Sequence, residues 1–391
     1  MEQRECALGA VAERRRNMKE SKLLRAKTLD LRVTRPLTPE RQENSRKNEE
    51  EALAGKLILE SMPRRFVFEL TNACNLNCKM CGRNSADFQP TWFQMEWLKY
   101  FEPVAHLVEE VTLMGWGEPT VHPHFAEFLD WAHQLGLRKY FCTNGMRLDR
   151  LFDDIFRTET DIIAVSMDGA CAETNEEIRR GADFHKILKN ISAITEYKTA
   201  HGLEFPYMNF VFTAMDQNLG ELPELVRLAG ETGLDEVKAV YLTAFDQKMA
   251  PEVLYDKMSR TREVFQAAME MGKRCGVSLK LPHLVGEDPA GDQCHKTCYT
   301  AWRDFFLGSD GFVRPCMSTA EKLFPIQRYG SFGEMWNSSE YQQHRGRVNG
   351  ERMALSCRNC YQSSYANWNK RESFIQVGKE FSPDWEKHEM G

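Results

Sequence analysis

TNACNLNCKMCGRN, residues 71–84, places three cysteines within eight residues. Cys74, Cys78 and Cys81 follow the apolar run RRFVFEL at 64–70, which predicts a β-strand. Thiols at this density are typical of zinc or iron–sulfur sites, and a structural zinc site needs four protein ligands. A 4Fe-4S cluster held by three thiolates keeps one iron open for another ligand. The stretch therefore favours a cluster with an open iron after the first strand.

The composition limits the class of this 391-residue chain. Its net charge of -6 gives no reason to expect nucleic acid as a partner. We expect no membrane partner and no secretory signal, because no apolar run would span a bilayer and the N-terminus is charged. The expected location is therefore cytoplasmic, where thiols stay reduced. Twelve cysteines there indicate metal binding or redox chemistry rather than disulfides.

Changes in composition and in hydrophobic pattern divide the chain into four regions. Residues 1–60 are polar and charge-rich, so we expect a flexible or partly helical extension, with a lid or a partner-docking arm as the alternative. Residues 61–285 alternate strand and helix patterns, whereas 286–375 concentrate cysteine, aromatic residues and glycine. Residues 376–391 are expected to form a solvated tail.

Alternating strands and helices predict a parallel sheet or barrel. Strands are expected at 64–70, 109–115, 138–144, 161–169, 207–215 and 234–242, with a short one at 277–282. Helices are expected near 93–107 and at 125–136, 184–202, 222–233 and 252–275. Functional residues of such folds lie at the C-terminal ends of the strands, and the cysteine-rich stretch follows the first of them.

C-x3-C-x2-C after the first strand of a βα barrel resembles the radical S-adenosylmethionine (SAM) superfamily. The resemblance implies an α/β fold, a partial (β/α)6 TIM-like barrel, over about residues 65–285. It also implies that Cys74, Cys78 and Cys81 hold a 4Fe-4S cluster whose open iron binds SAM. In that family, reductive cleavage of SAM yields a 5′-deoxyadenosyl radical, which abstracts hydrogen from the substrate.

Other segments resemble the family's SAM-binding positions in the same order along the chain. MGWGEP at 114–119 resembles the Gly-Gly-Glu-Pro segment after the second strand, although Trp116 stands between its two glycines. CTNG at 142–145 and SMDG at 166–169 resemble the ends of the third and fourth strands. The resemblance implies that Glu118 faces the SAM ammonium group. The implied cofactor-binding residues are Met80, Gly115, Gly117, Glu118, Pro119, Asn144, Ser166 and Arg179.

A second cysteine group resembles the SPASM and twitch extensions of radical SAM enzymes. The resemblance implies one auxiliary 4Fe-4S cluster, as in the butirosin aminocyclitol dehydrogenase type, because no cysteine follows Cys360. Its implied metal ligands are Cys298, Cys316, Cys357 and Cys360. Cys294 competes with Cys298 for one position, and a zinc ribbon stays open as an alternative.

Several further thiols and two histidines are of types that can take part in chemistry. Cys294 or Cys171 is a candidate catalytic hydrogen-atom donor, with a packing thiol as the alternative. Cys142 and Cys275 are expected in the core, since unpaired cysteine buries readily. His122 and His124, in TVHPHF, are expected as turn and helix-start residues rather than metal ligands.

The resemblance implies a radical SAM oxidoreductase or epimerase. A small polar substrate, such as a sugar or aminocyclitol, is favoured because residues 1–60 are too polar and short for the leader-binding domain of many peptide-modifying relatives. Two alternatives stay open: a peptide- or protein-modifying maturase, and a non-catalytic iron–sulfur or zinc protein. A reductase of the flavodoxin or ferredoxin type is the implied electron donor.

Overall fold

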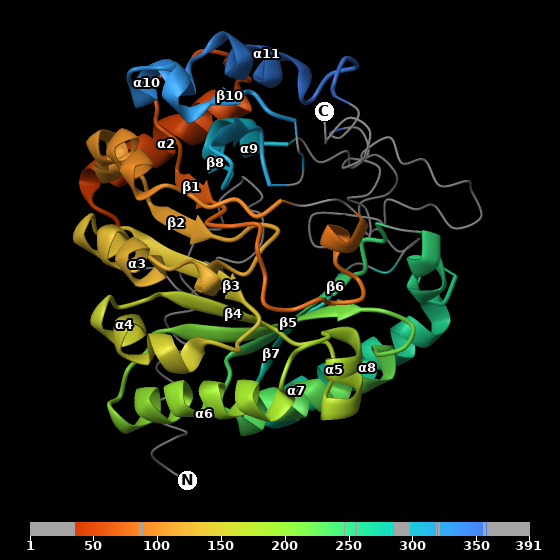
Figure 1. The fold of residues 1–391 in the computed structure, drawn as a ribbon. Helices are drawn as coiled ribbons and strands as arrows, with labels where there is room; N and C mark the ends of the chain where they lie inside the picture. The colour runs from red at the N-terminus through yellow and green to blue at the C-terminus, as the bar shows by residue number, and fades with distance from the viewer. Residues whose placement is uncertain are drawn as a thin grey trace.

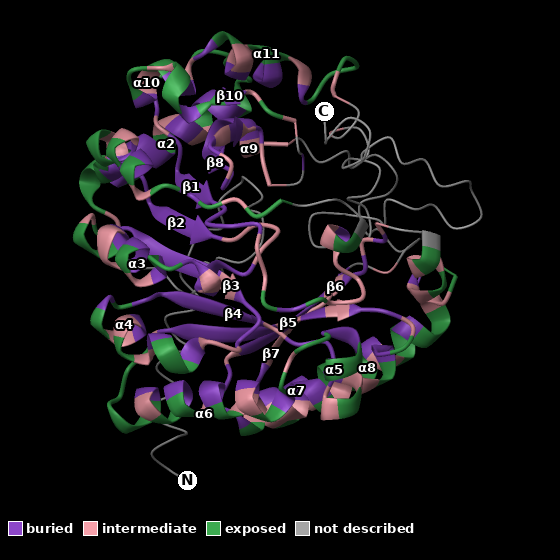
Figure 2. Cartoon of the chain, in the orientation of Figure 1, coloured by how far each residue is buried: buried purple, intermediate pink, exposed green. Residues whose placement is uncertain are grey.

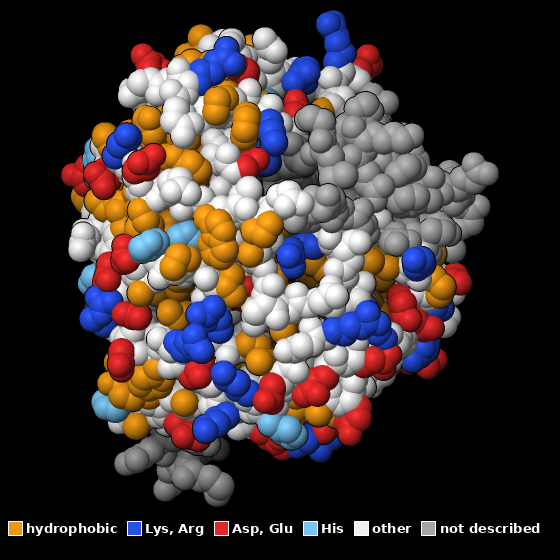
Figure 3. All heavy atoms as spheres, in the orientation of Figure 1, with side chains coloured by type: hydrophobic (Ala, Val, Ile, Leu, Met, Phe, Trp, Pro, Cys, Tyr) orange, Lys and Arg blue, Asp and Glu red, His pale blue; other side chains and the backbone are white. Residues whose placement is uncertain are grey.

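A computed structural model describes residues 36–85, 89–245, 247–254, 256–282, 284, 298–317, 319, 321–354 and 357. Its described strands form one sheet of ten, in the order β10-β9-β8-β1-β2-β3-β4-β5-β6-β7. The sheet curves, and helices line its outer side (Figure 1). On the face seen in Figure 3, acidic and basic side chains are interspersed rather than gathered by sign.

Seven parallel strands make up the barrel part of the sheet. They are β1 (Arg65–Phe68), β2 (Glu110–Leu113), β3 (Arg138–Thr143), β4 (Ile162–Ser166), β5 (Tyr207–Ala214), β6 (Glu236–Tyr241) and β7 (Ser278–Lys280). Neighbouring strands pair in parallel from β1 to β7. Each lies where its sequence pattern predicts, which confirms the α/β partial-barrel fold.

Helices connect these strands on the outer side of the sheet (Figure 1). They are α3 (Phe125–Gln134), α4 (Phe152–Arg157), α5 (Ala172–Ile178), α6 (Phe184–Ala200), α7 (Leu222–Glu231) and α8 (Met258–Cys275). The helix predicted near 93–107 is instead two 3-10 helices, η2 (Met95–Tyr100) and η3 (Glu102–Leu107). Pro103 lacks an N–H donor, so a continuous α-helix would break there. No helix of the described residues is long and apolar enough to cross a membrane.

The two faces of the curved sheet have different character. Val237, Ala239 and Tyr241 of β6 belong to the apolar core under the helices. The alternate residues Glu236 and Lys238 are also buried but polar, and side chains alternate between the two faces of a strand. Figure 2 shows how burial concentrates in the strands and on the inner sides of the helices. The inside of the barrel is therefore partly polar.

The cysteine-rich C-terminal region extends the same sheet. Its elements are α9 (Thr300–Arg303), β8 (Asp304–Leu307), β9 (Phe312–Arg314), β10 (Phe324–Pro325), α10 (Phe332–Trp336) and α11 (Ser339–Arg347). β8 pairs in parallel with β1, and β9 and β10 continue as antiparallel strands. Asp304 lies opposite Arg65 in this register and forms a buried ion pair with it.

The described part of the N-terminal region is helical, which is one of the two forms that we predicted for residues 1–60. Pro39–Leu53 forms helix α2, and several of its polar side chains are buried. Arg41 donates hydrogen bonds of 2.7 Å to the carbonyls of Leu135 and Gly136, at the end of α3. Asn48 donates to the carbonyl of Trp302 at 2.7 Å. The helix is ordered because its polar groups satisfy carbonyls at the ends of other elements.

Candidate cluster and cofactor site

The cysteine loop, residues 71–85, leaves β1 at the C-terminal edge of the sheet. Cys74, Cys78 and Cys81 are half-buried and form no disulfide. Burial raises the pKa of Cys78 to about 11, Arg179 opposes the rise, and the other two thiols add to it. The three sulfurs therefore lie within electrostatic reach of one another. Bound iron would supply the positive charge that three thiolates need.

The donor set fits a cluster better than a single metal ion. Each thiolate of a 4Fe-4S cluster binds a different iron, so the sulfurs need not meet at one point. A structural zinc site would need four protein ligands, whereas the three thiols of this loop suffice for a 4Fe-4S cluster with one open iron.

The segment 115–118 is fastened to the cysteine loop. The backbone N–H of Glu118 donates to the carbonyl of Ala73 at 2.9 Å. A Cβ on Gly117 would lie 2.3 Å from the carbonyl oxygens of Thr71 and Ala73. Only glycine permits this approach, because both contacts are to backbone. Gly117 therefore has a reason to be glycine that does not depend on its predicted approach to SAM.

Glu118 joins the ends of β2 and β3. Its Oε1 accepts hydrogen bonds from the hydroxyls of Thr120 and Thr143 at 2.6 and 2.7 Å, and from the N–H of Thr120 at 3.2 Å. Its Oε2 accepts from the N–H of Asn144 at 2.7 Å. Asn144 in turn donates to Asn75 of the cysteine loop at 2.9 Å. Burial raises the pKa of Glu118, and these four donors oppose the rise. Its role toward the SAM ammonium stays a prediction.

Arg179 forms a buried ion pair beside the cysteine loop. Its Nη2 lies 2.7 Å from Oδ2 of Asp168, which follows β4. Asp168 also accepts the N–H of Thr213 at 2.7 Å. The sequence did not single out Asp168 as the partner of Arg179, although it lies in the SMDG segment at 166–169. Its position after a strand was the available signal.

The other predicted SAM-binding residues lie at the same edge of the sheet. Met80 packs against a small apolar cluster that includes Ile178, Met215 and Leu242. Ser166 ends β4 and is half-buried, while Pro119 begins the 3-10 helix η4 (Pro119–Val121).

Trp116, the departure from the family's Gly-Gly pair, reaches the segment after β6. The centre of its ring lies 5.6 Å from that of Phe245, in an edge-to-face contact. A Cβ on Gly82, the residue after Cys81, would come within 3.0 Å of both rings. The Trp116 ring therefore packs on the cysteine loop.

The structure describes three of the cysteines predicted to bind the auxiliary cluster. Cys298, Cys316 and Cys357 are half-buried, whereas Cys294 and Cys360 lie outside the described residues. The N–H of Cys298 donates to Asn349 Oδ1 at 2.8 Å, and its carbonyl accepts from Asn349 Nδ2 at 3.0 Å. Asn349 thus holds Cys298 next to the chain that leads to Cys357. Their roles as ligands stay predictions.

The remaining thiols are fixed by other contacts. Cys171 precedes α5, and its sulfur lies 3.6 Å from the Thr174 hydroxyl and 3.9 Å from a Glu221 carboxylate oxygen. Cys142 and Cys275 pack against core clusters, as predicted. The hydrogen-donor role of Cys171 stays a prediction.

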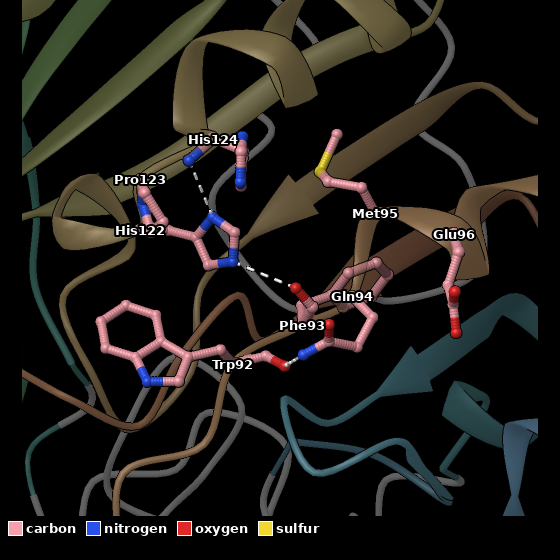
Figure 4. A pocket seen from close by; sticks show the side chains of 8 residues that line it. All are labelled: Trp92, Phe93, Gln94, Met95, Glu96, His122, Pro123 and His124. Carbon is pink, nitrogen blue, oxygen red and sulfur yellow. Dashed lines mark hydrogen bonds between the residues drawn. The ribbon is translucent and has the colours of Figure 1, made fainter.

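His122 and His124 have structural positions, as predicted. His122 ends η4, and His124 precedes α3. His122 Nδ1 accepts the N–H of His124 at 3.2 Å, so Nε2 carries the proton and donates to the carbonyl of Phe93 at 3.1 Å (Figure 4). Burial lowers the pKa of His122 below its usual value. Both border a surface pocket of about 370 Å³ beside Trp92 (Figure 4).

Two family models match the chain. The model of the radical SAM superfamily matches residues 68–229, and the model of an iron-sulfur cluster-binding domain, SPASM, matches residues 298–361.

Curated relatives match over much of the chain. The AdoMet-dependent heme synthase of Methanosarcina barkeri is 29% identical over 309 residues, which cover 73% of this chain and 85% of that protein. The tungsten-containing aldehyde ferredoxin oxidoreductase cofactor-modifying protein of Pyrococcus furiosus is 24% identical over 304 residues, 70% and 80% of the two chains. The mycofactocin maturase MftC of Mycobacterium tuberculosis is 30% identical over 175 residues, 44% and 43% of the two chains.

Solved structures share the fold. Streptococcus suis SuiB bound to S-adenosylmethionine superposes with a TM-score of 0.58 at 15% identity, covering 96% of this chain and 88% of that chain. The structure described as native anSMEcpe with bound AdoMet gives a TM-score of 0.58 at 17% identity, covering 83% and 95%. At these sequence identities, the structural similarity shows a shared fold and nothing beyond the fold.

Proposed function

Because this chain belongs to the radical SAM superfamily and carries a SPASM domain, we propose that it abstracts a hydrogen atom from a small polar molecule and so dehydrogenates or epimerises it. In a dehydrogenation the substrate radical would also lose a proton to a base and one electron to the auxiliary cluster, whereas in an epimerisation it would take a hydrogen atom from a thiol. Its cofactors are SAM and two 4Fe-4S clusters, one of which binds SAM while the other is auxiliary. SAM bound at the cluster supplies the hydrogen-abstracting 5′-deoxyadenosyl radical. The observation that carries the proposal is the contact of segment 115–118 with the cysteine loop.

The residues of this chain would have three tasks in that reaction. Cys74, Cys78 and Cys81 would hold the SAM-binding cluster, and the backbone of segment 115–118 would hold the SAM ammonium group. The Arg179–Asp168 pair, beside Cys78, would face the SAM carboxylate through the guanidinium. Arg179 Nε has no hydrogen-bond partner among the described residues, which leaves a donor for such a group.

We place the substrate at the inner face of the barrel. Toward the C-terminal edge, residues that alternate with the helix-facing core are only partly buried. They are Met114, Cys142, Ser166, Val211, Thr213 and Val240. This mixed wall of hydroxyl, thiol and apolar groups suits a small molecule with polar substituents. The relatives matched over 80% or more of their length are named for cofactor modification and heme synthesis, which also favours a non-peptide substrate.

A peptide is the second candidate, and specific relatives favour it. MftC is named as a maturase, and the Bacillus subtilis protein AlbA, 22% identical over 285 residues, is named for biosynthesis of the bacteriocin subtilosin. A peptide would enter the barrel from the same edge and be modified by the same chemistry.

The function is tested on anaerobically reconstituted protein with SAM and dithionite, and then with flavodoxin or ferredoxin as the proposed physiological donor. We expect 5′-deoxyadenosine from the wild type and none from Cys78→Ala. About eight irons per chain are expected for two clusters. Zinc in place of iron would instead support the non-catalytic alternative.

The substrate class is tested with deuterated cell extract divided into small-molecule and peptide fractions. Deuterium in 5′-deoxyadenosine after incubation with the small-molecule fraction supports the first candidate. Deuterium transfer from the peptide fraction alone would replace it with the second.

A further inference from the structure

Glu69 is a buried carboxylate, 6% exposed, directly after β1, and nothing above gives it a role. Its Oε1 accepts the backbone N–H of Trp116 at 2.8 Å. Its Oε2 accepts the hydroxyl of Ser309 at 3.0 Å and the backbone N–H of Ser309 at 3.3 Å. One side chain thus joins the middle of segment 115–118 to the turn between β8 and β9.

Gly115 makes room for this arrangement. A Cβ on Gly115 would lie 2.4 Å from Cγ and 2.6 Å from Oε1 of Glu69. The glycine therefore lets the Glu69 carboxylate pass under the segment and reach the N–H of Trp116. The backbone of Glu69 is fixed as well, because its N–H donates to the carbonyl of Leu307 at 3.0 Å.

The same contacts continue into the cysteine loop. The hydroxyl of Ser309 lies 2.7 Å from that of Thr91. The N–H of Thr91 donates to Asn72 Oδ1 at 2.8 Å, two residues before Cys74. On the other side of Ser309, β9 ends two residues before Cys316. Glu69 is thus hydrogen-bonded to the predicted SAM-binding backbone and, through Ser309, to the loops that carry both cysteine groups.

Only a carboxylate satisfies this set of donors. Two backbone N–H groups and a hydroxyl point at two oxygens, and the N–H groups cannot turn around. A glutamine would place its NH2 group against one of them and leave a buried donor without an acceptor, which is unfavourable. A shorter aspartate would not span the two segments.

We propose that Glu69 is a positioning residue: it holds the backbone of Gly115–Gly117 in its SAM-binding conformation and fastens that segment to the β8–β9 turn of the SPASM domain. The proposal rests on the proposed function, in which segment 115–118 binds SAM.

The experiment compares Glu69→Gln with Glu109→Gln in the reconstituted holoenzyme. Glu109 is the control, because it is a buried carboxylate at the opposite edge of the sheet, bonded to Arg64 and Ser45 at 2.6 Å each and paired with Arg138. The dissociation constant of SAM is measured by equilibrium dialysis, together with the SAM-induced change in the EPR spectrum of the reduced cluster and the melting temperature. We expect Glu69→Gln to weaken SAM binding about tenfold or more and Glu109→Gln to leave it within about twofold.

Each result decides a different point. Glu69→Gln with wild-type SAM affinity overturns the positioning role, and so does an equal loss of affinity in both variants at equal melting temperature. A wild type that holds both clusters yet binds no SAM overturns the proposed function instead.

A third variant covers the case in which Glu69→Gln does not fold. Ser309→Ala removes one donor and keeps both N–H contacts, so it should weaken SAM binding about two- to fivefold. Unchanged affinity in that variant overturns the link to the SPASM domain.

Discussion

At the residue scale, the site depends on close approaches between backbone segments. Gly82, Gly115 and Gly117 each face an atom closer than 3.0 Å from the place where a Cβ would stand. Gly82 meets the ring of Trp116, and Gly115 meets Glu69. Gly117 meets only backbone atoms, which cannot turn away as a side chain can. The cysteine loop and segment 115–118 are therefore packed as one unit.

Gly117→Ala is expected to displace the cysteine loop, because the new Cβ would overlap two carbonyl oxygens. We predict a loss of about 1–3 kcal/mol in the free energy of unfolding and a reconstituted protein that retains less iron than the wild type. Gly333→Ala is the control, since a Cβ there meets nothing within 4 Å. Urea unfolding and iron analysis measure both effects. Full iron and full stability in Gly117→Ala would contradict the packing described above.

His344 is expected to make stability depend on pH. Burial, with Arg347 and Arg345 nearby, lowers the pKa of His344 from 6.5 to about 4. The unfolded chain binds a proton below pH 6.5 whereas the folded chain does not until about pH 4. The stability that the folded state owes to a neutral His344 is therefore complete above pH 6.5 and is lost as the pH falls toward 4.

We predict that this histidine accounts for about 2 kcal/mol of the stability lost between pH 7 and pH 5. Urea unfolding of wild type and His344→Gln at the two pH values measures it. The variant should lose less on acidification, and an equal loss in both proteins would exclude His344 as the cause.

At the element scale, the polar helix α2 is held in place by hydrogen bonds of its buried side chains. Its polar side chains reach carbonyls of η3, α3 and α9 rather than water. Glu51 also accepts hydrogen bonds from the hydroxyl and the N–H of Ser61, which holds the connection to β1. The polar side chains of α2 therefore stabilise an ordered helix, because they bond backbone carbonyls that lie far away along the chain.

Arg41→Ala tests the role of α2. Removal of the guanidinium leaves the carbonyls of Leu135 and Gly136 without this donor, and we predict a loss of about 2–3 kcal/mol. Arg46→Ala, on the exposed side of the same helix, removes ion pairs with Glu43 and Glu50 and should leave the urea midpoint nearly unchanged, because water and salt screen exposed charges. Urea midpoints compare the two. Equal losses would mean that α2 is not fixed by its buried side.

At the scale of the whole molecule, the barrel and the SPASM region share one sheet. β8 continues the parallel pairing from β1, and Asp304 at its start is paired with Arg65 and Arg303. All three side chains are buried. Since the pairing crosses the boundary between the two matched domains, we expect the two regions to unfold together.

Asp304→Ala tests this coupling. The change removes the carboxylate that two buried guanidinium groups share, while Arg65 keeps Glu110 at 3.9 Å, and we predict a loss of about 3 kcal/mol or more in the free energy of unfolding. Circular dichroism and tryptophan fluorescence should follow one urea transition in the wild type, and the same transition at lower urea in the variant. Glu224→Ala, an exposed ion-pair partner of Arg227, is the control and should change little. Two separate transitions in the wild type would contradict the coupling.

The sequence by itself determined where the seven strands of the barrel lie along the chain, the cysteine loop and the approximate positions of segments 115–118 and 166–169. These follow from patterns within a few residues: apolar alternation, helix periodicity and the spacing of cysteines. Only the tertiary structure decided the place of α2, the pairing of β8 with β1, and the contacts of Glu69 and Asp168. Glu69 and Ser309 are 240 residues apart in the chain, and Arg65 and Asp304 are 239 apart. Local patterns carry no information about such pairs, because the contacts form only when the sheet brings distant strand ends together.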